Sequence, residues 1–484
     1  MQGARARAFR AARNTGKPSM DIDTGQDRPA HCPALLITST ASGQGKTTLT
    51  AALARLHARQ GRQVRIFKCG PDFLDPHWHA LASGAPVHSI DLWMTGEDDI
   101  RARLHAAARE ADLIIVEGVM GLFDGDPCAA DVAERLGLPV LAVIDASGMA
   151  ETFGALAHGL RHYRPGLRWA GLLANRVGSE RHAELLRRGL RDPALWLGAL
   201  ARVQGPDAAA LLPERHLGLV AAHELGDALQ RLDVAADALL ATPLGRLPWQ
   251  AALGQGASWQ DWCVAFEPAA PSQQVQPWLA GRTVAVARDA AFSFIYEANL
   301  DCLRALGARL AFFSPLAGER LPGCDALWLP GGYPELHLAA LAAQVGLRED
   351  IASHAAAGKA IWAECGGMLA LCERLTDNTG RTTDLWGLLP GHARMQPRLA
   401  GLGMLELPTP WGPLRGHTFH YSRLETDMPE AARSHRPGQA VQPGRGEALY
   451  RHGSVHASYF HAWFASQPRA VAALLGAAPR AERP

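Results

Sequence analysis

The sequence predicts an α/β protein with two large domains, each built on a mostly parallel sheet. Short apolar runs alternate with amphipathic stretches, a pattern typical of parallel strands covered by helices. A Pro- and Gln-rich interruption, EPAAPSQQVQPWL over residues 267–279, separates two such series. The chain has 484 residues, enough for two large domains. We therefore expect an extension over 1–30, a first domain over 31–265, a linker over 266–280 and a second domain over 281–475.

The composition is that of an ordinary soluble protein, with 48% hydrophobic and 20% charged residues and a net charge of +1. This charge favours neither nucleic acid nor a membrane surface as a partner. No apolar run reaches the roughly 18–20 residues that a membrane span needs. The eight cysteines contain no Cys-x-x-Cys pair, which argues against disulfides and zinc and fits a reducing cytoplasm.

The first thirty residues are rich in Arg and Ala and then turn polar. We expect them to be disordered, with Met20 as an alternative start. A targeting peptide is a second alternative, although the segment has no apolar core of the secretory kind.

The strands of each series are predicted from short apolar runs, and the helices from the longer stretches between them. In the first series the predicted strands are Ala34–Thr38, Val64–Lys68, Leu113–Glu117, Val140–Asp145 and Gly171–Asn175, with helices at Thr47–Gln60 and Glu180–Gly189. In the second series the predicted strands are Thr283–Ala287, Leu310–Phe313, Ala326–Leu329 and Ala360–Ala363. The segment Ser434–Glu447 is expected to be a surface loop.

A phosphate-binding loop follows the first predicted strand. TASGQGKTT, residues 40–48, has Walker A spacing except that Thr40 replaces the first glycine. Such a loop places backbone N–H groups around phosphates at a helix N-terminus. We expect ATP to bind over Gly43, Gly45 and Thr48, with Lys46 on the phosphates and Thr47 on Mg²⁺. A plain Gly-rich turn is the alternative, but a turn has no need of the Lys-Thr pair.

Carboxylates follow two of the predicted strands. Glu117 ends the strand Leu113–Glu117 and is expected to bind Mg²⁺, because it lies at the edge where the P-loop lies. Asp124 is next along the same loop. Asp72 and Asp75 follow the strand Val64–Lys68 and are expected to face the phosphates, holding metal or substrate. A loop-capping role is the alternative for Glu117 and Asp124.

Several polar side chains near the phosphate-binding loop carry weaker signals. Asn175 ends a later strand, where its amide group can bond adenine. Lys68 ends the second strand and is expected to face the phosphates. His77 and His79 follow it, and for His77 we favour a packing role.

The second series contains a nucleophile elbow with cysteine in the place of serine. Cys365 lies between an apolar strand and a helical stretch in the sequence WAECGGM. Such a helix N-terminus is expected to lower the pKa of its thiol. Gly331 and Gly332 are candidates for an oxyanion hole, and His461 for the base. A buried inert thiol is the alternative for Cys365. For His417 and His420 we favour substrate contact or packing over a metal role.

Together these motifs resemble the cobyrinic acid a,c-diamide synthase family over about residues 33–466. The resemblance rests on SGQGKTT (42–48), FKCGPD (67–72), VEGVMGLFDG (116–125), NRV (175–177), PERHLGL (213–219), FSPL (313–316), GGYPE (331–335) and ASY (457–459). It implies a first domain similar to dethiobiotin synthetase, binding ATP and Mg²⁺, and a second similar to class I glutamine amidotransferases. The implied reaction amidates the a and c side chains of cobyrinate or hydrogenobyrinate in cobalamin biosynthesis, with nitrogen from glutamine.

The same resemblance implies roles for particular residues. Lys46 and Thr47 match phosphate and Mg²⁺ contacts, and Glu117 matches a metal ligand. Asp72 and Asp124 match acids between ATP and the corrinoid. Cys365 matches the nucleophile, with His461 as its activator.

The sequence departs from the pattern of these enzymes at several positions. Class I enzymes usually carry a Glu two residues after the histidine, but Trp463 stands there, so the residue that orients His461 is not identified. The loop at 126–131 is short and lacks a Gly-Ser-Thr segment. Thr418 stands where many members carry Glu.

Other functions compete with this interpretation. A cobyric acid synthase amidates other corrin side chains, but VEGVMGLFDG and PERHLGL point away from it. A P-loop switch ATPase usually has an additional Lys early in its loop, where this chain has Ala41. A glutaminase domain that only binds glutamine is a third alternative. Whether the corrin contains cobalt stays open, and a homodimer is among the assemblies that the sequence allows.

Overall fold

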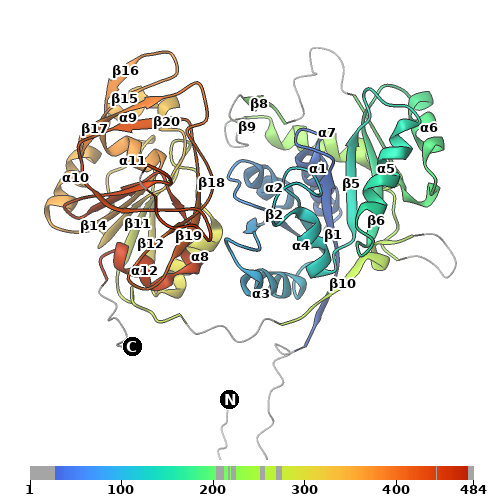
Figure 1. Ribbon diagram of the computed structural model, residues 1–484, viewed down its shortest axis with the longest axis horizontal. Coiled ribbons are helices and arrows are strands. Elements are labelled where there is room, and N and C mark those ends of the chain that lie inside the picture. The colour runs from blue at the N-terminus through green and yellow to red at the C-terminus, as the bar shows by residue number, and fades with distance from the viewer. Residues whose placement is uncertain are drawn as a thin grey trace, which may run out of the picture.

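The computed structural model describes residues 28–202, 212–215, 218–219, 225–250, 257–268, 275–442 and 444–477. These residues form two α/β bodies that lie side by side, with the N-terminal body blue to green and the C-terminal body yellow to red (Figure 1). The predicted extension falls almost wholly outside these ranges, as do residues 269–274 of the predicted linker and His216 and Leu217 of the PERHLGL motif. None of the described helices is long and apolar enough to cross a membrane.

The N-terminal body is built on a parallel sheet with the strand order β3-β2-β4-β1-β5-β6-β7. Its strands are β1 (Ala30–Ser39), β2 (Val64–Cys69), β3 (His88–Ile90), β4 (Leu113–Glu117), β5 (Val140–Asp145), β6 (Trp169–Val177) and β7 (Trp196–Ala201). The strand β10 (Cys263–Phe266) pairs antiparallel with the start of β1. The bounds predicted for β4 and β5 are confirmed, whereas β3, β7 and β10 were not predicted.

Helices cover both faces of this sheet, because each buried strand presents alternate residues to opposite sides. Leu35 and Ile37 of β1 share a core with α1 and α2, while Ala34 and Leu36 share a separate core with α3 and α4. The helices are α1 (Lys46–Arg59), α2 (Asp75–Ser83), α3 (Glu97–Ala108), α4 (Ala129–Leu136), α5 (Thr152–Tyr163), α6 (Glu180–Gly189) and α7 (Ala228–Leu240). Short elements complete this body: η1 (Pro193–Leu195), β8 (Glu214–Arg215), β9 (Gly218–Leu219) and η4 (Trp259–Trp262).

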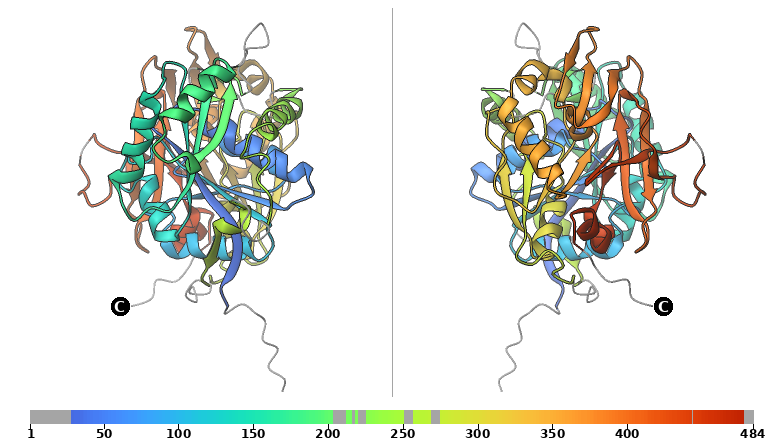
Figure 2. Two further views of the ribbon diagram at one scale, coloured as in Figure 1. Left: turned by 90° about the vertical axis from the view of Figure 1, so that its right-hand side faces the viewer. Right: turned by 90° about the vertical axis from the view of Figure 1, so that its left-hand side faces the viewer.

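The C-terminal body has a sheet with the order β12-β11-β13-β14-β23-β22-β21, parallel from β12 to β23 and antiparallel beyond. The strands are β11 (Thr283–Ala287), β12 (Arg309–Phe313), β13 (Ala326–Leu329), β14 (Ala360–Glu364), β21 (Glu430–Arg433), β22 (Ala448–His452) and β23 (Val455–Ser458). Its helices are α8 (Glu297–Ala305), η5 (Pro334–Leu336), α9 (Leu338–Ala342), α10 (Val345–Ala356), α11 (Gly366–Leu371), η6 (Phe464–Ser466) and α12 (Pro468–Leu474). In both bodies helices lie in front of the sheet when the molecule is viewed from its ends (Figure 2).

Smaller sheets follow the turn at Cys365, between β14 and α11, and the sequence did not predict them. One has the order β16-β15-β17-β20 and the other β18-β19-β24. Their strands are β15 (Cys372–Thr376), β16 (Thr382–Asp384), β17 (Leu389–Met395), β18 (Gly401–Leu407), β19 (Leu414–His420), β20 (Ser422–Glu425) and β24 (His461–Ala462). Strands β18 and β19 face the N-terminal body (Figure 1).

Apolar side chains join the two bodies. Met94 is buried with Tyr296 and Trp463, and Phe73 and Met404 pack against this cluster. A hydrogen bond of 2.5 Å from the Arg415 guanidinium to the carbonyl of Trp93 crosses the same boundary. These contacts place the loop after β2 directly against the C-terminal body.

Candidate active site

The phosphate-binding loop leads from β1 into α1 through Gly45, whose φ of 102° lies in the left-handed region. A Cβ on Gly45 would lie 2.3 Å from Nδ2 of Asn175, so a larger residue would be strained at this φ and would displace the Asn175 amide. The Asn175 amide donates a hydrogen bond of 2.9 Å to the carbonyl of Gln44. Asn175 therefore supports the loop directly, and its contact with adenine stays a prediction.

Lys46, the first residue of α1, is buried against neutral oxygen atoms. Its Nζ donates to the carbonyl of Met120 at 2.6 Å, to Oγ of Ser39 at 2.9 Å and to the carbonyl of Ala41 at 3.2 Å. Burial, and then the charge of Lys68, lower the pKa of Lys46 to about 8. These hydrogen bonds to neutral oxygens leave the charge of Lys46 available to an anion such as a phosphate.

Glu117, at the end of β4, is the centre of a buried polar cluster. Its Oε1 accepts hydrogen bonds of 2.9 Å from Oγ1 of Thr47 and from Nζ of Lys68. On its other oxygen, Oε2, it lies 2.8 Å from Nε2 of His79. Asp75 joins the cluster at 3.0 Å from Lys68 and 3.2 Å from Thr47. The sequence did not pair His79 with Glu117, because nothing local indicates that α2 packs against β4.

The charged side chains of this cluster stabilise one another's ionised forms. Burial opposes the charge on Lys68, but Glu117, Asp75 and Asp72 outweigh burial and raise its pKa well above the ordinary value. Burial likewise opposes the charge on Glu117, but Lys68 and His79 outweigh it and hold its pKa well below the ordinary value. Lys68 is therefore a buried cation at neutral pH, at the edge of the sheet where phosphates are expected.

Oxygen atoms near the P-loop have the chemistry that Mg²⁺ prefers. Thr47, Glu117 and Asp75 bring a hydroxyl and two carboxylates within hydrogen-bond distance. No group of three or more His, Cys, Asp or Glu arranged for a metal occurs within the described ranges. Proteins usually bind Mg²⁺ through one or two carboxylates together with substrate phosphates, and the Thr47 hydroxyl and the carboxylates of Glu117 and Asp75 are oxygens of this kind.

A cavity of about 960 Å³ lies over these residues at the carboxyl ends of the strands. We name it the nucleotide cavity, and it brings together most of the predicted residues of this end. Those that line it are Gly43, Gly45, Lys46, Thr47, Thr48, Lys68, Asp72, Asp75, Glu117 and Asn175.

Asp124 does not line the nucleotide cavity. Its Oδ2 accepts a hydrogen bond of 2.9 Å from the backbone N–H of Gly121, so it closes the turn of its own loop. A Cβ on Gly121 would lie 2.6 Å from Asp124, which explains the glycine. The loop-capping role is present in the structure, and the substrate role of Asp124 stays a prediction.

Cys365 lies in a sharp turn between β14 and α11, with φ of 43°. Its N–H donates a hydrogen bond of 2.7 Å to the carbonyl of Ser458 on β23. A Cβ on Gly366 would lie 2.8 Å from the nitrogen of Gly332. The left-handed conformation and this close approach are the geometry of the predicted nucleophile elbow.

Gly331 and Gly332 lie between the elbow and His461. A Cβ on Gly331 would lie 2.4 Å from Cε1 of His461, and the nitrogen of Gly332 is next to the Cys365–Gly366 segment. The ring of His461 stacks on that of His417 at 4.9 Å. The structure thus brings together the nucleophile, base and oxyanion candidates named from the sequence, and their catalytic roles stay predictions.

The expected lowering of the thiol pKa is not found. Burial, and then the carboxyl group of Glu335, raise the pKa of Cys365. The helix α11 has only six residues, so its N-terminal field is weak against the burial of the thiol. Burial, and then the neighbouring His417 and His420, hold the pKa of His461 well below the ordinary value. In this arrangement thiol and imidazole are both neutral.

Of the remaining histidines, His420 packs within the C-terminal body. His420 stacks on Tyr459 at 3.7 Å and lies 3.1 Å from Glu447. Thr418 donates a hydrogen bond of 2.9 Å to the same Glu447, so a carboxylate lies beside the position where the resemblance implies Glu. His77, by contrast, lines a cavity.

A cavity of about 200 Å³, which we name the connecting cavity, lies between the two bodies. Residues of the β2–α2 loop form one side, and the C-terminal body forms the other. It is lined by Pro71, Asp72, Phe73, Leu74, Asp75, Phe294, Tyr333, His417, Phe419 and His461. Because Asp72 and Asp75 also line the nucleotide cavity, the connecting cavity and the nucleotide cavity share a wall.

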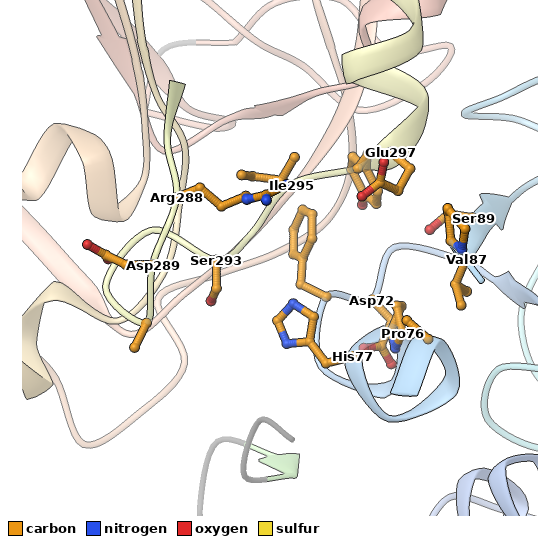
Figure 3. Close-up of a pocket in the computed structure, with 15 residues that line it drawn as sticks. Asp72, Pro76, His77, Val87, Ser89, Arg288, Asp289, Ser293, Ile295 and Glu297 are labelled. Carbon is orange, nitrogen blue, oxygen red and sulfur yellow. The ribbon is translucent and has the colours of Figure 1, made fainter. Parts of the chain in front are cut away.

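A further cavity of about 450 Å³ opens on the other side of the same loop. Asp72, Pro76 and His77 from the N-terminal body face Arg288, Ser293, Ile295 and Glu297 from the C-terminal body (Figure 3). The loop after β2 is thus surrounded by cavities.

Comparisons with known proteins agree with this arrangement. Residues 35–210 match the CobQ/CobB/MinD/ParA nucleotide binding domain, and residues 283–469 match the CobB/CobQ-like glutamine amidotransferase domain. The chain is 56% identical to the hydrogenobyrinate a,c-diamide synthase of Stutzerimonas stutzeri, covering 92% of this chain and 99% of that protein. It is 46% identical to the cobyrinate a,c-diamide synthase of Herminiimonas arsenicoxydans (90% and 95%) and 36% identical to that of Salmonella typhimurium (92% and 98%). The chain therefore belongs to the family of cobyrinate and hydrogenobyrinate a,c-diamide synthases.

Proposed function

We propose that this protein is a ligase that uses ATP and glutamine to amidate the a and c carboxylates of cobyrinate or hydrogenobyrinate. One observation carries the proposal. Asp72 and Asp75 line both the nucleotide cavity and the connecting cavity that reaches His461. A carboxylate at this wall is within reach of a phosphoryl donor on one side and of released ammonia on the other.

The first step activates a carboxylate, which is a poor electrophile. A carboxylate oxygen attacks the γ-phosphorus of ATP, ADP leaves, and an acyl phosphate forms. Lys46 and Lys68 offset the negative charge that the phosphoryl group carries in transfer. Thr47 and Glu117 would hold Mg²⁺, which supplies further neutralisation of the phosphates when bound.

The second step releases ammonia from glutamine. Sγ of Cys365 attacks the side-chain amide carbon, and His461 passes the thiol proton to the leaving nitrogen. The N–H groups near Gly331 and Gly332 stabilise the oxyanion. Water then hydrolyses the glutamyl thioester to glutamate. Because burial raises the pKa of Cys365 and lowers that of His461, glutamine binding has to favour their ion pair.

Ammonia then has to cross to the acyl phosphate, attack its carbonyl carbon and displace phosphate. The connecting cavity provides a route, since His461 lies at one end and Asp72 and Asp75 lie at the other. Its aromatic lining, which includes Phe73 and Phe419, keeps ammonia neutral and therefore nucleophilic.

The corrin ring has a candidate docking face beside this route. Leu402 and Phe419 lie directly opposite each other on β18 and β19 and are 60% and 37% exposed. Phe419 also lines the connecting cavity. An apolar macrocycle resting on this pair places its acetate side chains toward the shared wall.

The alternatives are less well supported. The relatives are named a,c-diamide synthases, which favours the a and c side chains over those amidated by a cobyric acid synthase. A switch ATPase does not account for the glutamine amidotransferase domain.

Each of the eight cysteines lies in the described part of the chain and is a free thiol. A cytoplasmic location fits these thiols.

The test is product mass from hydrogenobyrinate and from cobyrinate, with ATP and either glutamine or ammonia. The wild type should lower the corrinoid mass by about 1 Da for each carboxylate amidated and stop after two. Cys365→Ala should do so with ammonia and fail with glutamine. ATP hydrolysis without any change in corrinoid mass would contradict the proposed substrate, and failure of Cys365→Ala with ammonia would contradict the division between sites.

A further inference from the structure

The residue before the nucleophile, Glu364, is a buried acid beside the catalytic histidine. Its Oε1 accepts a hydrogen bond of 2.7 Å from the indole N–H of Trp362 and one of 3.3 Å from the backbone N–H of Ala462. Its other oxygen, Oε2, lies 3.9 Å from Nδ1 of His461. The carboxyl group is therefore fixed by one oxygen and presents the other to the imidazole.

His461 has room for such a partner. Within the described residues, neither of its ring nitrogens has a hydrogen-bond partner, although the ring is almost fully buried. An unpaired buried imidazole is free to adopt either tautomer, and only one tautomer can accept a proton from the thiol through Nε2. Catalysis through Nε2 thus requires an acceptor at Nδ1.

The position that supplies this acceptor in class I enzymes has another role in this chain. Trp463 stands there, fully buried, with its ring 5.1 Å from that of Tyr296, and both are buried with Met94 of the N-terminal body. Its backbone N–H donates to the carbonyl of Arg415 at 2.8 Å. The residue two positions after His461 is therefore committed to the interdomain contact.

We propose that Glu364 is the positioning residue of His461, accepting Nδ1–H so that Nε2 takes the proton of Cys365. This rests on the proposed roles of Cys365 and His461 in glutamine hydrolysis. Glu364 first gives up its own proton to solvent. When Sγ then transfers its proton to Nε2, the imidazolium has a carboxylate at Nδ1, and no further proton has to leave the site. The distance of 3.9 Å shortens to a hydrogen bond when glutamine closes the site.

The pKa of Glu364 fits a carboxyl group whose charge depends on that of His461. Burial raises its pKa to about 8, against the hydrogen bonds from Trp362 and Ala462. A positive charge on His461 favours the ionised carboxylate. Glu364 is therefore expected to release its proton to solvent when glutamine closes the site, before the thiolate and imidazolium form.

A double-mutant cycle tests the proposal. Two readouts apply to every variant: turnover of glutamine, and the rate at which iodoacetamide alkylates Cys365, followed by peptide mass. Glu364→Gln keeps the shape and loses the charge. We expect glutamine kcat to fall on the order of 10²-fold with little change in KM. Glu364→Asp should recover part of this loss, and ammonia-dependent ligation should be unchanged.

The decisive comparison uses the His461→Ala background. If Glu364 acts through His461, Glu364→Gln slows alkylation in the wild type and leaves it unchanged in His461→Ala. Equal slowing in both backgrounds, or an unaffected single variant, overturns the proposal. Glu335→Gln is the matched control, because Glu335 is a second buried acid near Cys365 and its removal should act alike in both backgrounds.

The proposed function can fail separately from this inference. If His461→Ala itself retains full glutamine-dependent turnover, then the assignment of His461 as the base is wrong. If His461→Ala is inactive with glutamine and active with ammonia, the base is supported, and the cycle decides the role of Glu364 alone.

Discussion

The ring of Phe73 lies 5.3 Å from the ring of His461, although one residue follows β2 in the N-terminal body and the other lies on β24. Phe73 also stacks on Phe294 at 4.9 Å and lies 5.5 Å from His417. Its neighbours in sequence are Asp72 and Leu74, so the same short loop borders the nucleotide cavity. An aromatic contact therefore links the loop that borders the nucleotide cavity to His461.

Phe73→Ala should uncouple the two reactions. Without the ring, the connecting cavity opens and His461 loses a contact that depends on the loop, so ammonia escapes. We expect glutamine consumed per amide formed to rise from about one to several, while ammonia-dependent ligation changes only a few-fold. Glutamate and corrinoid amide are measured in one reaction. Phe312→Ala, at an aromatic residue of β12 with 38% exposure, is the control, and an unchanged ratio in Phe73→Ala would contradict the coupling.

Lys46→Ala should abolish ligation with either nitrogen source. The substitution removes the cation that faces the phosphates, and a loss of 10²-fold or more in kcat is expected. Glutamine hydrolysis without ATP should persist, because the cysteine site is intact. The control is Lys359→Ala, at an exposed lysine of the C-terminal body. Ammonia-dependent turnover near the wild-type rate in Lys46→Ala would disprove the assignment of the P-loop.

Lys68→Met should destabilise the protein and change its response to Mg²⁺. The substitution leaves Glu117, Asp75 and Asp72 without their cation, and breaking a buried pair of this kind costs about 3–5 kcal/mol. Added Mg²⁺ should restore part of the loss, because a cation then occupies the same carboxylates. Denaturant unfolding at several Mg²⁺ concentrations measures both effects.

The control for Lys68 is Arg65→Met, on the same strand, which breaks an ion pair of 3.5 Å with an exposed Glu110. A surface pair contributes about 0–1 kcal/mol and should show no dependence on Mg²⁺. Equal losses in the two variants would mean that Lys68 does not hold the carboxylate cluster.

Phe419→Ala should weaken corrinoid binding. The ring contributes apolar surface beside Leu402, so we expect KM for the corrinoid to rise about 10-fold, as loss of one buried aromatic contact permits. KM for ATP should not change. Phe312→Ala serves again as the control because its exposure is nearly the same. An unchanged corrinoid KM, or a changed glutamine KM alone, would move the docking face elsewhere.

Glu364→Gln should change how stability depends on pH. Burial raises the pKa of Glu364 from 4.5 to about 8, so in the wild type its contribution is fully present below pH 4.5 and is lost as pH rises through 8. The Gln variant has no such loss. The free energy of unfolding of Glu364→Gln should therefore rise relative to that of the wild type between pH 5 and 8.5, by up to about 5 kcal/mol. The control is Glu349→Gln, at an exposed position of α10, which should have the same pH dependence of stability as the wild type. If the free energies of unfolding of Glu364→Gln and the wild type differ by the same amount at every pH, the raised pKa of Glu364 is wrong.

The parts of the fold that the sequence predicted are those set by local pattern. Strands such as Leu113–Glu117 are apolar up to a charged last residue, so their bounds were found within one or a few residues. The smaller sheets were missed because their strands are short and half exposed: β15 reads CERLT, and its charged residues resemble a loop. Pairing between β1 and β10 joins residues more than 200 positions apart, which no local pattern reveals.

The residues of the candidate site divide in the same way, into those that local sequence reveals and those that only the fold brings together. Motif spacing located Lys46, Cys365 and Gly331, because each depends on a turn that glycine makes possible. Glu364 was overlooked because it reads as the polar end of an apolar strand, and its relation to His461 exists only after β14 and β24 meet. Phe73 gave no signal at all, since a single aromatic residue in a loop is ordinary.

Asp72 lines all three cavities around the β2–α2 loop, and this has a consequence for inhibition. A compound that fills one cavity and extends past Asp72 into a second would copy the meeting of phosphorylated carboxylate and ammonia. Such a compound would have to fit both bodies at once, so enzymes that share only the P-loop or only the cysteine elbow would bind half of it. Selectivity would then come from the junction, where each half alone binds weakly.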